Sequence, residues 1–346
     1  MRGTTMFSTI RRRHFSTITA AVALTAVAAC ATTTDAAKST DQPTPTRIST
    51  AYELPGDRVY PEGIAVDVRS GDTYVGSYAN GAIYHATPGA RRAEIFLTEG
   101  TDGRKTTNGL KVDKAGRLWV IDSTAGVAVY DTATRAMIAR FDVPASTPHM
   151  VNDLAITPDG TAYLTDSTAA VVYRVTPAQL ADTAAHGGKA VLTAQFDLNA
   201  ELAAHETGTF TLNGIVTDDS GRYLLAVDMT AGELYRIATE PNSPDPIRKV
   251  AMHGGDLKHG DGLELHGDTL WAAHNTTNTI SRWKITDDGA TATLERSITD
   301  ASLSIPTTLV RTGDQTLVVS SQFDKGGPMG PGTPTNPFTV LTVDGI

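Results

Sequence analysis

Short runs of alternating hydrophobic and polar residues recur along most of this 346-residue chain. In the best-defined unit, Asn152 and Asp153 precede an apolar run, residues 158–160 form a Pro-Asp-Gly turn, and a second apolar run ends at Asp166. An alternation with a period of two is typical of β-strands, and Pro-Asp-Gly is typical of a tight turn. The pattern predicts pairs of strands joined by short turns.

The same unit occurs six times, and this repetition decides the fold. The residues at equivalent positions are spaced by 46, 44, 61, 48 and 45 residues; they are Glu62, Asn108, Asn152, Asn213, Asp261 and Pro306. A period near 45 with several strands in each unit is typical of a β-propeller blade. We therefore predict an all-β protein, a six-bladed β-propeller with four-stranded blades. Residues 49–52 would pair with residues 338–343 in the last blade, so that the N- and C-terminal strands close the ring and cover an edge.

Two segments depart from the repeat. The 61-residue interval carries an insertion, in which residues 177–181 are expected to form a short helix. Residues 325–334 are rich in Gly and Pro, and cannot form a strand ladder because Pro lacks the N–H donor. This second segment is predicted to be a loop over one face, either a flexible lid or a surface loop without a role.

The first 30 residues have the pattern of an export signal. Arg11, Arg12 and Arg13 precede an apolar run over residues 18–29, which is followed by Cys30. A basic segment before a short apolar run is typical of a secretory signal peptide. The small residues before Cys30 resemble a bacterial lipobox, which predicts a lipoprotein anchored to the outer face of the cytoplasmic membrane; the alternative is an ordinary signal peptide and a secreted protein.

The Arg12-Arg13 pair also resembles a twin-arginine signal, so the export route stays open. We expect three segments: a signal peptide (residues 1–30), a flexible tether (31–46) and the propeller (47–346).

Composition and missing motifs exclude several functions. The formal net charge is −9, and the chain has no basic block, so nucleic-acid binding lacks electrostatic support. A single cysteine excludes an intrachain disulfide. No nucleophile elbow, P-loop or zinc-protease motif occurs, which leaves serine-hydrolase, nucleotide and zinc functions unsupported. We expect a monomer that acts on a small molecule and meets the membrane through its lipid anchor alone.

The repeated polar residues are the candidate functional site. Each lies at the start of a predicted innermost strand, so a ring of blades would bring Glu62, Asn108, Asn152, Asn213 and Asp261 toward one end of the central axis. Any one of them alone reads as a turn former, whereas their recurrence favours a shared site. Carboxylate and amide oxygens suit calcium, with other divalent cations less favoured.

These motifs resemble those of the gluconolactonase/regucalcin (senescence marker protein) family of six-bladed calcium propellers, over nearly all of residues 47–346. The resemblance implies that the calcium ligands are Glu62, Asn152, Asn213 and Asp261. It places Asn108 in the substrate pocket. One position departs from the family: Met150 stands where sugar lactonases typically carry an arginine. A thioether cannot replace the guanidinium donors, so a less polar lactone or ester is expected.

The implied activity is hydrolysis of a lactone or ester whose carbonyl is polarised by the ion. Asp261 would act as base or nucleophile. His149 and His259 flank predicted ligands and would shuttle protons, unless they are polar residues without a role. Two alternatives remain: a non-enzymatic binding or scaffold propeller with a structural calcium ion, and a strictosidine-synthase-like or isomerase activity on the same architecture.

Overall fold

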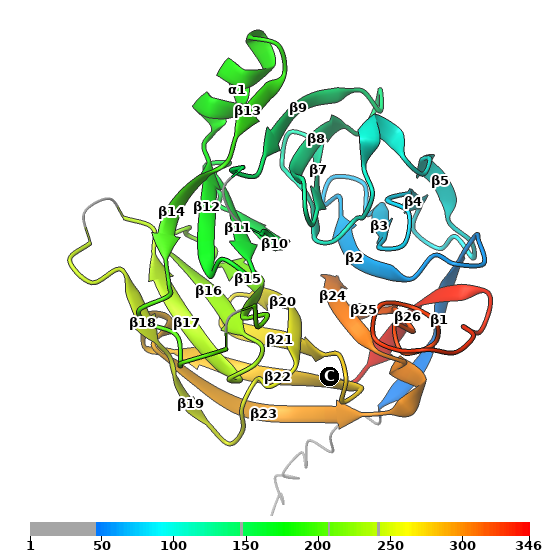
Figure 1. Ribbon diagram of the computed structural model, residues 1–346. Helices are drawn as coiled ribbons and strands as arrows, with labels where there is room; N and C mark the ends of the chain where they lie inside the picture. The colour runs from blue at the N-terminus through cyan, green and yellow to red at the C-terminus, as the bar shows by residue number, and fades with distance from the viewer. Residues whose placement is uncertain (1–45, 146–147, 207, 241–242) are drawn as a thin grey trace, which may run out of the picture. The chain divides into compact units, whose positions relative to one another are not determined.

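A computed structural model describes residues 46–145, 148–206, 208–240 and 243–346 of the chain. These residues belong to one compact unit, Pro43–Ile346. Six sheets, each built on four antiparallel strands, are arranged like the blades of a propeller around a central axis (Figure 1). The predicted six-bladed architecture is confirmed. The predicted signal peptide, Cys30 and the tether lie outside the described residues.

The strands follow one another blade by blade. Blade 1 contains β2 (Pro61–Val66), β3 (Thr73–Ser77), β4 (Ile83–Ala86) and β5 (Glu94–Leu97). Blade 2 contains β6 (Leu110–Val112), β7 (Arg117–Asp122), β8 (Gly126–Asp131) and β9 (Met137–Asp142). Blade 3 contains β10 (Val151–Ile156), β11 (Ala162–Asp166), β12 (Val171–Val175) and β14 (Thr193–Asp197).

Blade 4 contains β15 (Leu212–Thr217), β16 (Tyr223–Asp228), β17 (Glu233–Ala238) and β18 (Ile247–Lys249). Blade 5 contains β20 (Gly260–His266), β21 (Thr269–His274), β22 (Thr279–Thr286) and β23 (Thr291–Thr299). Blade 6 contains β24 (Pro306–Thr312), β25 (Gln315–Ser320), β26 (Phe338–Asp344) and β1 (Arg47–Leu54). Single 3-10 turns occur at η1 (Thr101–Gly103), η2 (Asp287–Gly289) and η3 (Ala301–Leu303).

The N-terminal strand closes the ring. β1 pairs antiparallel with β26 from Arg47↔Asp344 to Leu54↔Phe338. Each innermost strand contacts the innermost strands of both neighbouring blades, in the closed order β2, β6, β10, β15, β20 and β24. The predicted pairing of the two ends of the propeller is therefore confirmed, and it is longer than the four residues expected.

The insertion within blade 3, between β12 and β14, contains the predicted helix, which extends to α1 (Pro177–Ala185). Thr176 caps it by accepting a hydrogen bond from the N–H of Gln179, and the Gln179 side chain bonds back to Thr176 N–H, a capping box. The chain then forms β13 (Lys189–Val191), which pairs parallel with β9 as a fifth strand on blade 2. A similar short strand, β19 (Ala251–His253), pairs parallel with β23 on blade 5.

Large apolar side chains fill the space between the blades. The recurrent aromatic residue of the repeat is almost fully buried in five blades, as Tyr84, Tyr130, Tyr173, Tyr235 and Trp283. Burying such a ring contributes about 1.5–3 kcal/mol. The structure thus derives its stability from blade-to-blade packing, which leaves the axis free for polar residues. No described helix is long and apolar enough to cross a membrane.

Candidate functional site

An interruption in the innermost strands positions the candidate residues. In blade 3 the pairing of β10 with β11 runs from Val151↔Asp166 directly to Leu154↔Leu164, so Asn152 and Asp153 have no partner. The same shift occurs in β2, β15, β20 and β24. A bulge of this kind re-aims the side chains of the unpaired residues. Glu62, Asn152, Asn213 and Asp261 stand at this point of their blades. Asn108 of blade 2 instead precedes β6, whose pairing with β7 has no such shift.

Glycine follows the polar residue where two blades come close together. A Cβ on Gly214 would lie 2.3 Å from the backbone oxygen of Asp261, and one on Gly63 would lie 2.1 Å from that of Asn108. These distances are far below van der Waals contact. The Asn-Gly, Glu-Gly and Asp-Gly pairs therefore allow close packing of the innermost strands, in addition to any role of their polar side chains.

The structure brings all five polar residues to one cavity of about 300 Å³. Its lining residues are Glu62, Tyr78, Asn108, Met150, Asn152, Phe210, Asn213, Met229, Asp261, Asn275, Phe323, Pro328 and Met329. A second, narrower cavity of about 10 Å³, roughly the space of one water, continues along the axis. Four residues line both cavities: Glu62, Asn152, Asn213 and Asp261. These four form the neck between the cavities, whereas Asn108 lines the larger one.

Hydrogen bonds orient the side chains at the neck. Asn275 donates through Nδ2 to Asp261 Oδ2 at 2.8 Å, and Asn152 donates through Nδ2 to Ser167 Oγ at 3.0 Å. Asn213 Nδ2 lies 3.3 Å from Met229 Sδ. The amide donors are thus turned toward neighbouring residues. The Asn275 amide oxygen is itself used, because it accepts a hydrogen bond from the N–H of Thr276 at 2.6 Å.

Two buried amide oxygens, Asn108 Oδ1 and Asn152 Oδ1, have no hydrogen-bond partner among the described residues. Unsatisfied buried acceptors are uncommon and call for an explanation. No cluster of three or more His, Cys, Asp and Glu side chains that could hold a metal occurs in the described part of the chain. A cation at the neck would therefore depend on amide oxygens as well as on two carboxylates, a donor set that suits calcium.

The charges at the neck also favour a cation. Burial raises the pKa of Glu62 well above its usual range, and repulsion by Asp261 and Asp153 raises it further. Burial and Asp153 likewise raise the pKa of Asp261, against the hydrogen bonds from Asn275 and Asn213. Within the described ranges, neither Glu62 nor Asp261 forms a salt bridge. A divalent cation would remove the repulsion that the protein itself leaves uncompensated.

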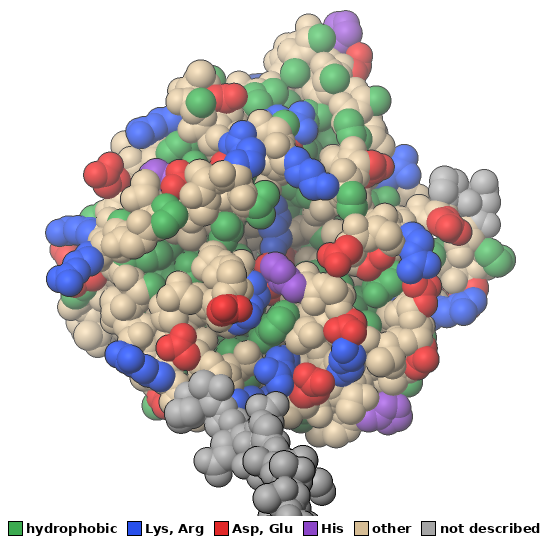
Figure 2. Space-filling model, turned by 180° about the vertical axis from the view of Figure 1, so that it is seen from behind, with side chains coloured by type: hydrophobic (Ala, Val, Ile, Leu, Met, Phe, Trp, Pro, Cys, Tyr) green, Lys and Arg blue, Asp and Glu red, His purple; other side chains and the backbone are tan. Residues whose placement is uncertain are grey.

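Charged residues continue along the axis beyond the neck. Lys111 and Asp153 line the narrow cavity, and Lys111 Nζ lies 3.4 Å from Glu264 Oε2, while His266 Nε2 lies 2.9 Å from Glu264 Oε1. Burial alone would raise the pKa of Glu264, but Lys111 and His266 outweigh it and lower that pKa. Lys111 is thus held by Glu264, so it does not neutralise the neck. Figure 2 shows that the face opposite to Figure 1 is hollowed near its centre, with basic and histidine side chains close to the hollow.

The two predicted proton-shuttling histidines lie outside both cavities. His149 uses Nδ1 with Asp166 Oδ2 at 2.8 Å and Nε2 with the carbonyl oxygen of Pro144 at 2.9 Å. It therefore fixes the chain that leads into β10. His259 is exposed, with its backbone in the left-handed region (φ 59°) at a turn before β20. Met150, in contrast, lines the large cavity as a pocket residue.

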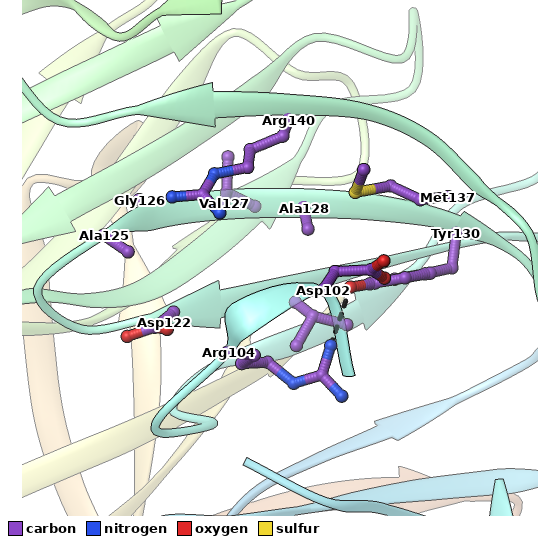
Figure 3. A pocket seen from close by; sticks show the side chains of 11 residues that line it. Asp102, Arg104, Asp122, Ala125, Gly126, Val127, Ala128, Tyr130, Met137 and Arg140 are labelled. Carbon is purple, nitrogen blue, oxygen red and sulfur yellow. Dashed lines mark hydrogen bonds between the residues drawn. The ribbon is translucent and has the colours of Figure 1, made fainter. Parts of the chain in front are cut away.

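A further pocket in blade 2 is too small for a substrate (Figure 3). Arg104 donates through Nη1 to the Tyr130 hydroxyl at 2.7 Å and through Nε to the carbonyl of Gly81. The free space is about 20 Å³, enough for a water. Arg104 therefore ties the loop around η1 to blade 2 and away from the axis.

Several site residues were not recognised in the sequence. Tyr78, Met229 and Asn275 each follow the second strand of their blade and line the large cavity. Their equivalent position in the repeat was a signal that could have revealed them. Phe210, Pro328 and Met329 come from loops outside the repeat, and no periodic signal marks them.

No family model matches the chain, and no curated protein matches its sequence. Among solved structures, the chain is similar to a gluconolactonase from Xanthomonas campestris, at 16% identity and a TM-score of 0.58, covering 86% of this chain and 89% of that chain. A luciferin-regenerating enzyme is similar at 12% identity and a TM-score of 0.58, covering 87% and 96%.

Virginiamycin B lyase from Staphylococcus aureus is similar at 12% identity and a TM-score of 0.55, covering 87% of this chain and 99% of that chain. At these identities the likeness shows the six-bladed fold alone. Because propellers with different activities share it, function has to be argued from the site.

Proposed function

We propose that the chain is a calcium-dependent hydrolase of a lactone or related ester, with another divalent cation as the second choice. The observation that carries the proposal is the neck itself. Two buried carboxylates, Glu62 and Asp261, repel each other there, and the amide oxygen of Asn152 has no partner among the described residues. This group opens directly into a cavity of about 300 Å³.

Glu62, Asn152, Asn213 and Asp261 would hold the cation through their side-chain oxygens. When bound, it would supply Lewis-acid polarisation of the substrate carbonyl. Asn108 lines the cavity next to Glu62, with its Oδ1 buried and unpaired, so it is placed to contact substrate or a water. The resemblance to gluconolactonase motifs and the likeness to gluconolactonase structures support the same assignment.

Asp261 is the proposed base or nucleophile. Asn275 binds one of its carboxylate oxygens, Oδ2, which fixes the orientation of the other. As base, Asp261 takes a proton from a water, the water oxygen bonds to the carbonyl carbon, the C–O bond of the ester breaks, and the proton passes to the departing oxygen. As nucleophile, the carboxylate attacks the carbonyl carbon directly, the C–O bond of the ester breaks, and the departing oxygen takes a proton from a water; the hydroxide so formed then cleaves the acyl-enzyme. His149 and His259 receive no role in this scheme because both lie outside the cavity.

A panel of lactones, aryl esters and phosphotriesters tests the proposal, with protein depleted of metal and then reloaded with calcium. We expect turnover that requires calcium and is abolished by Asp261→Asn. Asp268→Asn is the matched control. Asp268 lies on the exposed turn between β20 and β21, where it forms an ion pair with Lys284 of β22, and it does not line the cavity. Absence of hydrolysis across the whole panel by folded, calcium-loaded protein would refute the assignment.

The alternative is a binding or scaffold propeller in which the cation joins the blades. It is favoured by the origin of the ligands, which come from blades 1, 3, 4 and 5. Loss of calcium would then lower thermal stability with no activity to lose. For either function we propose export and attachment to the membrane through Cys30, which lies outside the described residues.

A further inference from the structure

The large cavity is divided into a polar floor and an apolar wall. The floor consists of the neck residues with Asn108 and Asn275. The wall consists of the remaining lining residues, which are apolar apart from the Tyr78 hydroxyl: Tyr78, Met150, Phe210, Met229, Phe323, Pro328 and Met329. The charged residues that line the cavity are the two carboxylates of the neck, and no lysine or arginine joins them among the described lining residues.

Two of the wall residues form an apolar rim at the surface. Phe210 is 49% exposed and Met329 is 45% exposed, and unlike other exposed apolar side chains of the described residues they also line this cavity. They belong to different loops, one before β15 and the other in the long segment between β25 and β26. Exposed apolar residues that border a cavity indicate a binding surface for an apolar group.

The loop that carries Pro328 and Met329 is held in place by hydrogen bonds. Tyr60 donates its hydroxyl to the carbonyl of Lys325 at 2.9 Å, and Met329 N–H donates to the carbonyl of Phe323 at 3.0 Å. Gln322 forms two hydrogen bonds with the backbone of Thr335, at 2.9 and 2.8 Å. The segment was predicted to be either a flexible lid or a surface loop without a role; its hydrogen bonds and its two lining residues instead make it part of the cavity wall.

We infer that the substrate carries an apolar, alkyl-type substituent, which the methionine-rich wall binds while the ester group faces the neck. This inference rests on the proposed function and specifies its substrate class. A polyhydroxylated sugar lactone would leave many hydroxyl groups without partners along this wall, and unpaired buried polar groups are strongly discriminated against. Methionine side chains adapt to flexible apolar chains, so alkyl chains of different length fit the same wall.

The first experiment measures hydrolysis of γ-lactones with unbranched alkyl substituents of increasing length, with gluconolactone for comparison. Each methylene that leaves water should increase kcat/KM about fourfold, the factor that corresponds to about 0.8 kcal/mol, until the cavity is filled. Gluconolactone should be a poor substrate. Equal kcat/KM values across the alkyl series, or a preference for gluconolactone, would overturn the inference and leave the proposed function intact.

The second experiment measures binding without catalysis. The corresponding alkyl lactams, which resist hydrolysis, are titrated into the calcium-loaded protein by calorimetry. We expect the Kd to fall with chain length, and Met329→Ser to weaken that dependence. Met137→Ser is the matched control, because Met137 is 37% exposed on β9 and does not line the cavity. It should leave the dependence unchanged, with thermal unfolding confirming that both variants fold.

The two experiments separate the two claims. Lactam binding that depends on chain length, without hydrolysis of any lactone or ester, would support the apolar site and refute the hydrolase. Lactam binding that is independent of chain length, or equally affected by Met329→Ser and Met137→Ser, would overturn the apolar site.

Discussion

The effect of calcium on stability should depend strongly on pH, because both carboxylates at the neck have raised pKa values. Unfolded Asp and Glu titrate near pH 4, at roughly 3.9 and 4.3. In the folded, metal-free protein, burial and mutual repulsion move the pKa of Glu62 and Asp261 upward. Between the unfolded and the raised folded values the native state binds more protons than the unfolded state. The free energy of unfolding of metal-free protein should therefore fall as pH rises through this window.

The affinity for calcium should change in the opposite direction and increase as the pH rises through this window. The ion binds the ionised carboxylates, so it displaces up to two protons, one from Glu62 and one from Asp261. The apparent Kd should fall up to 100-fold per pH unit within the window, which corresponds to about 2.7 kcal/mol for two protons. Above the window the dependence should disappear, because both groups are already ionised.

Thermal unfolding and calcium titration between pH 5 and pH 8 measure both trends. We expect little stabilisation by calcium at pH 5 and a large rise in Tm at pH 8, where a concentration of 100 times Kd stabilises by about 2.7 kcal/mol. Glu62→Gln should reduce the steepest slope of log Kd against pH from about two toward one. Stabilisation by calcium that is equal at all pH values would refute the assignment of these carboxylates as ligands.

Three further outcomes are expected. Asp261→Asn should abolish hydrolysis, whereas Asp268→Asn should not. A spectroscopic assay of the calcium-loaded variants measures hydrolysis, and their Tm values show whether they fold. Gly214→Ala should destabilise the protein by about 1–3 kcal/mol, because its Cβ would lie 2.3 Å from a backbone oxygen of blade 5. Gly255→Ala, whose Cβ would lie 3.1 Å from the Leu294 side chain and 3.2 Å from the Trp283 ring rather than against backbone, should cost less, and equal Tm values would contradict this packing argument. Cys30→Ala should release the protein from membranes, as fractionation and lipid labelling would show; unchanged retention would contradict the lipoprotein prediction.

Repetition explains which features the sequence could predict. Asn152 alone reads as a turn residue, but its equivalents in other blades reveal both the period and the shared axis. The ring closure followed from counting strands, and β1 with β26 confirmed it. Met150 lines the large cavity from the position just before β10, two residues before Asn152, while its predicted role toward a substrate stays a prediction.

Features that occur in a single blade were not predictable in this way. Lys111 lies in the middle of a strand with an alternating pattern. Its contact with Glu264, which is 153 residues away in the sequence, joins blades 2 and 5. Met329 depends on the path of a long loop, which hydrogen bonds to distant residues determine. His149 looked like a catalytic residue because it neighbours a predicted ligand, but sequence proximity does not reveal that Asp166 holds its ring.

The closure of the ring has a consequence for the order in which the protein is made. β26 lies between β1 and β25, so the first strand of the propeller to be synthesised has no partner until the last propeller strand has been made. Contacts between the two ends of a chain form slowly, because a long loop must close first. Until then blade 6 presents an unpaired edge, which is a site for wrong pairing between chains. Loss of β26 (Phe338–Asp344) would also leave β1 without a partner in blade 6. A short C-terminal truncation would therefore remove the pairing of both terminal strands and open the ring.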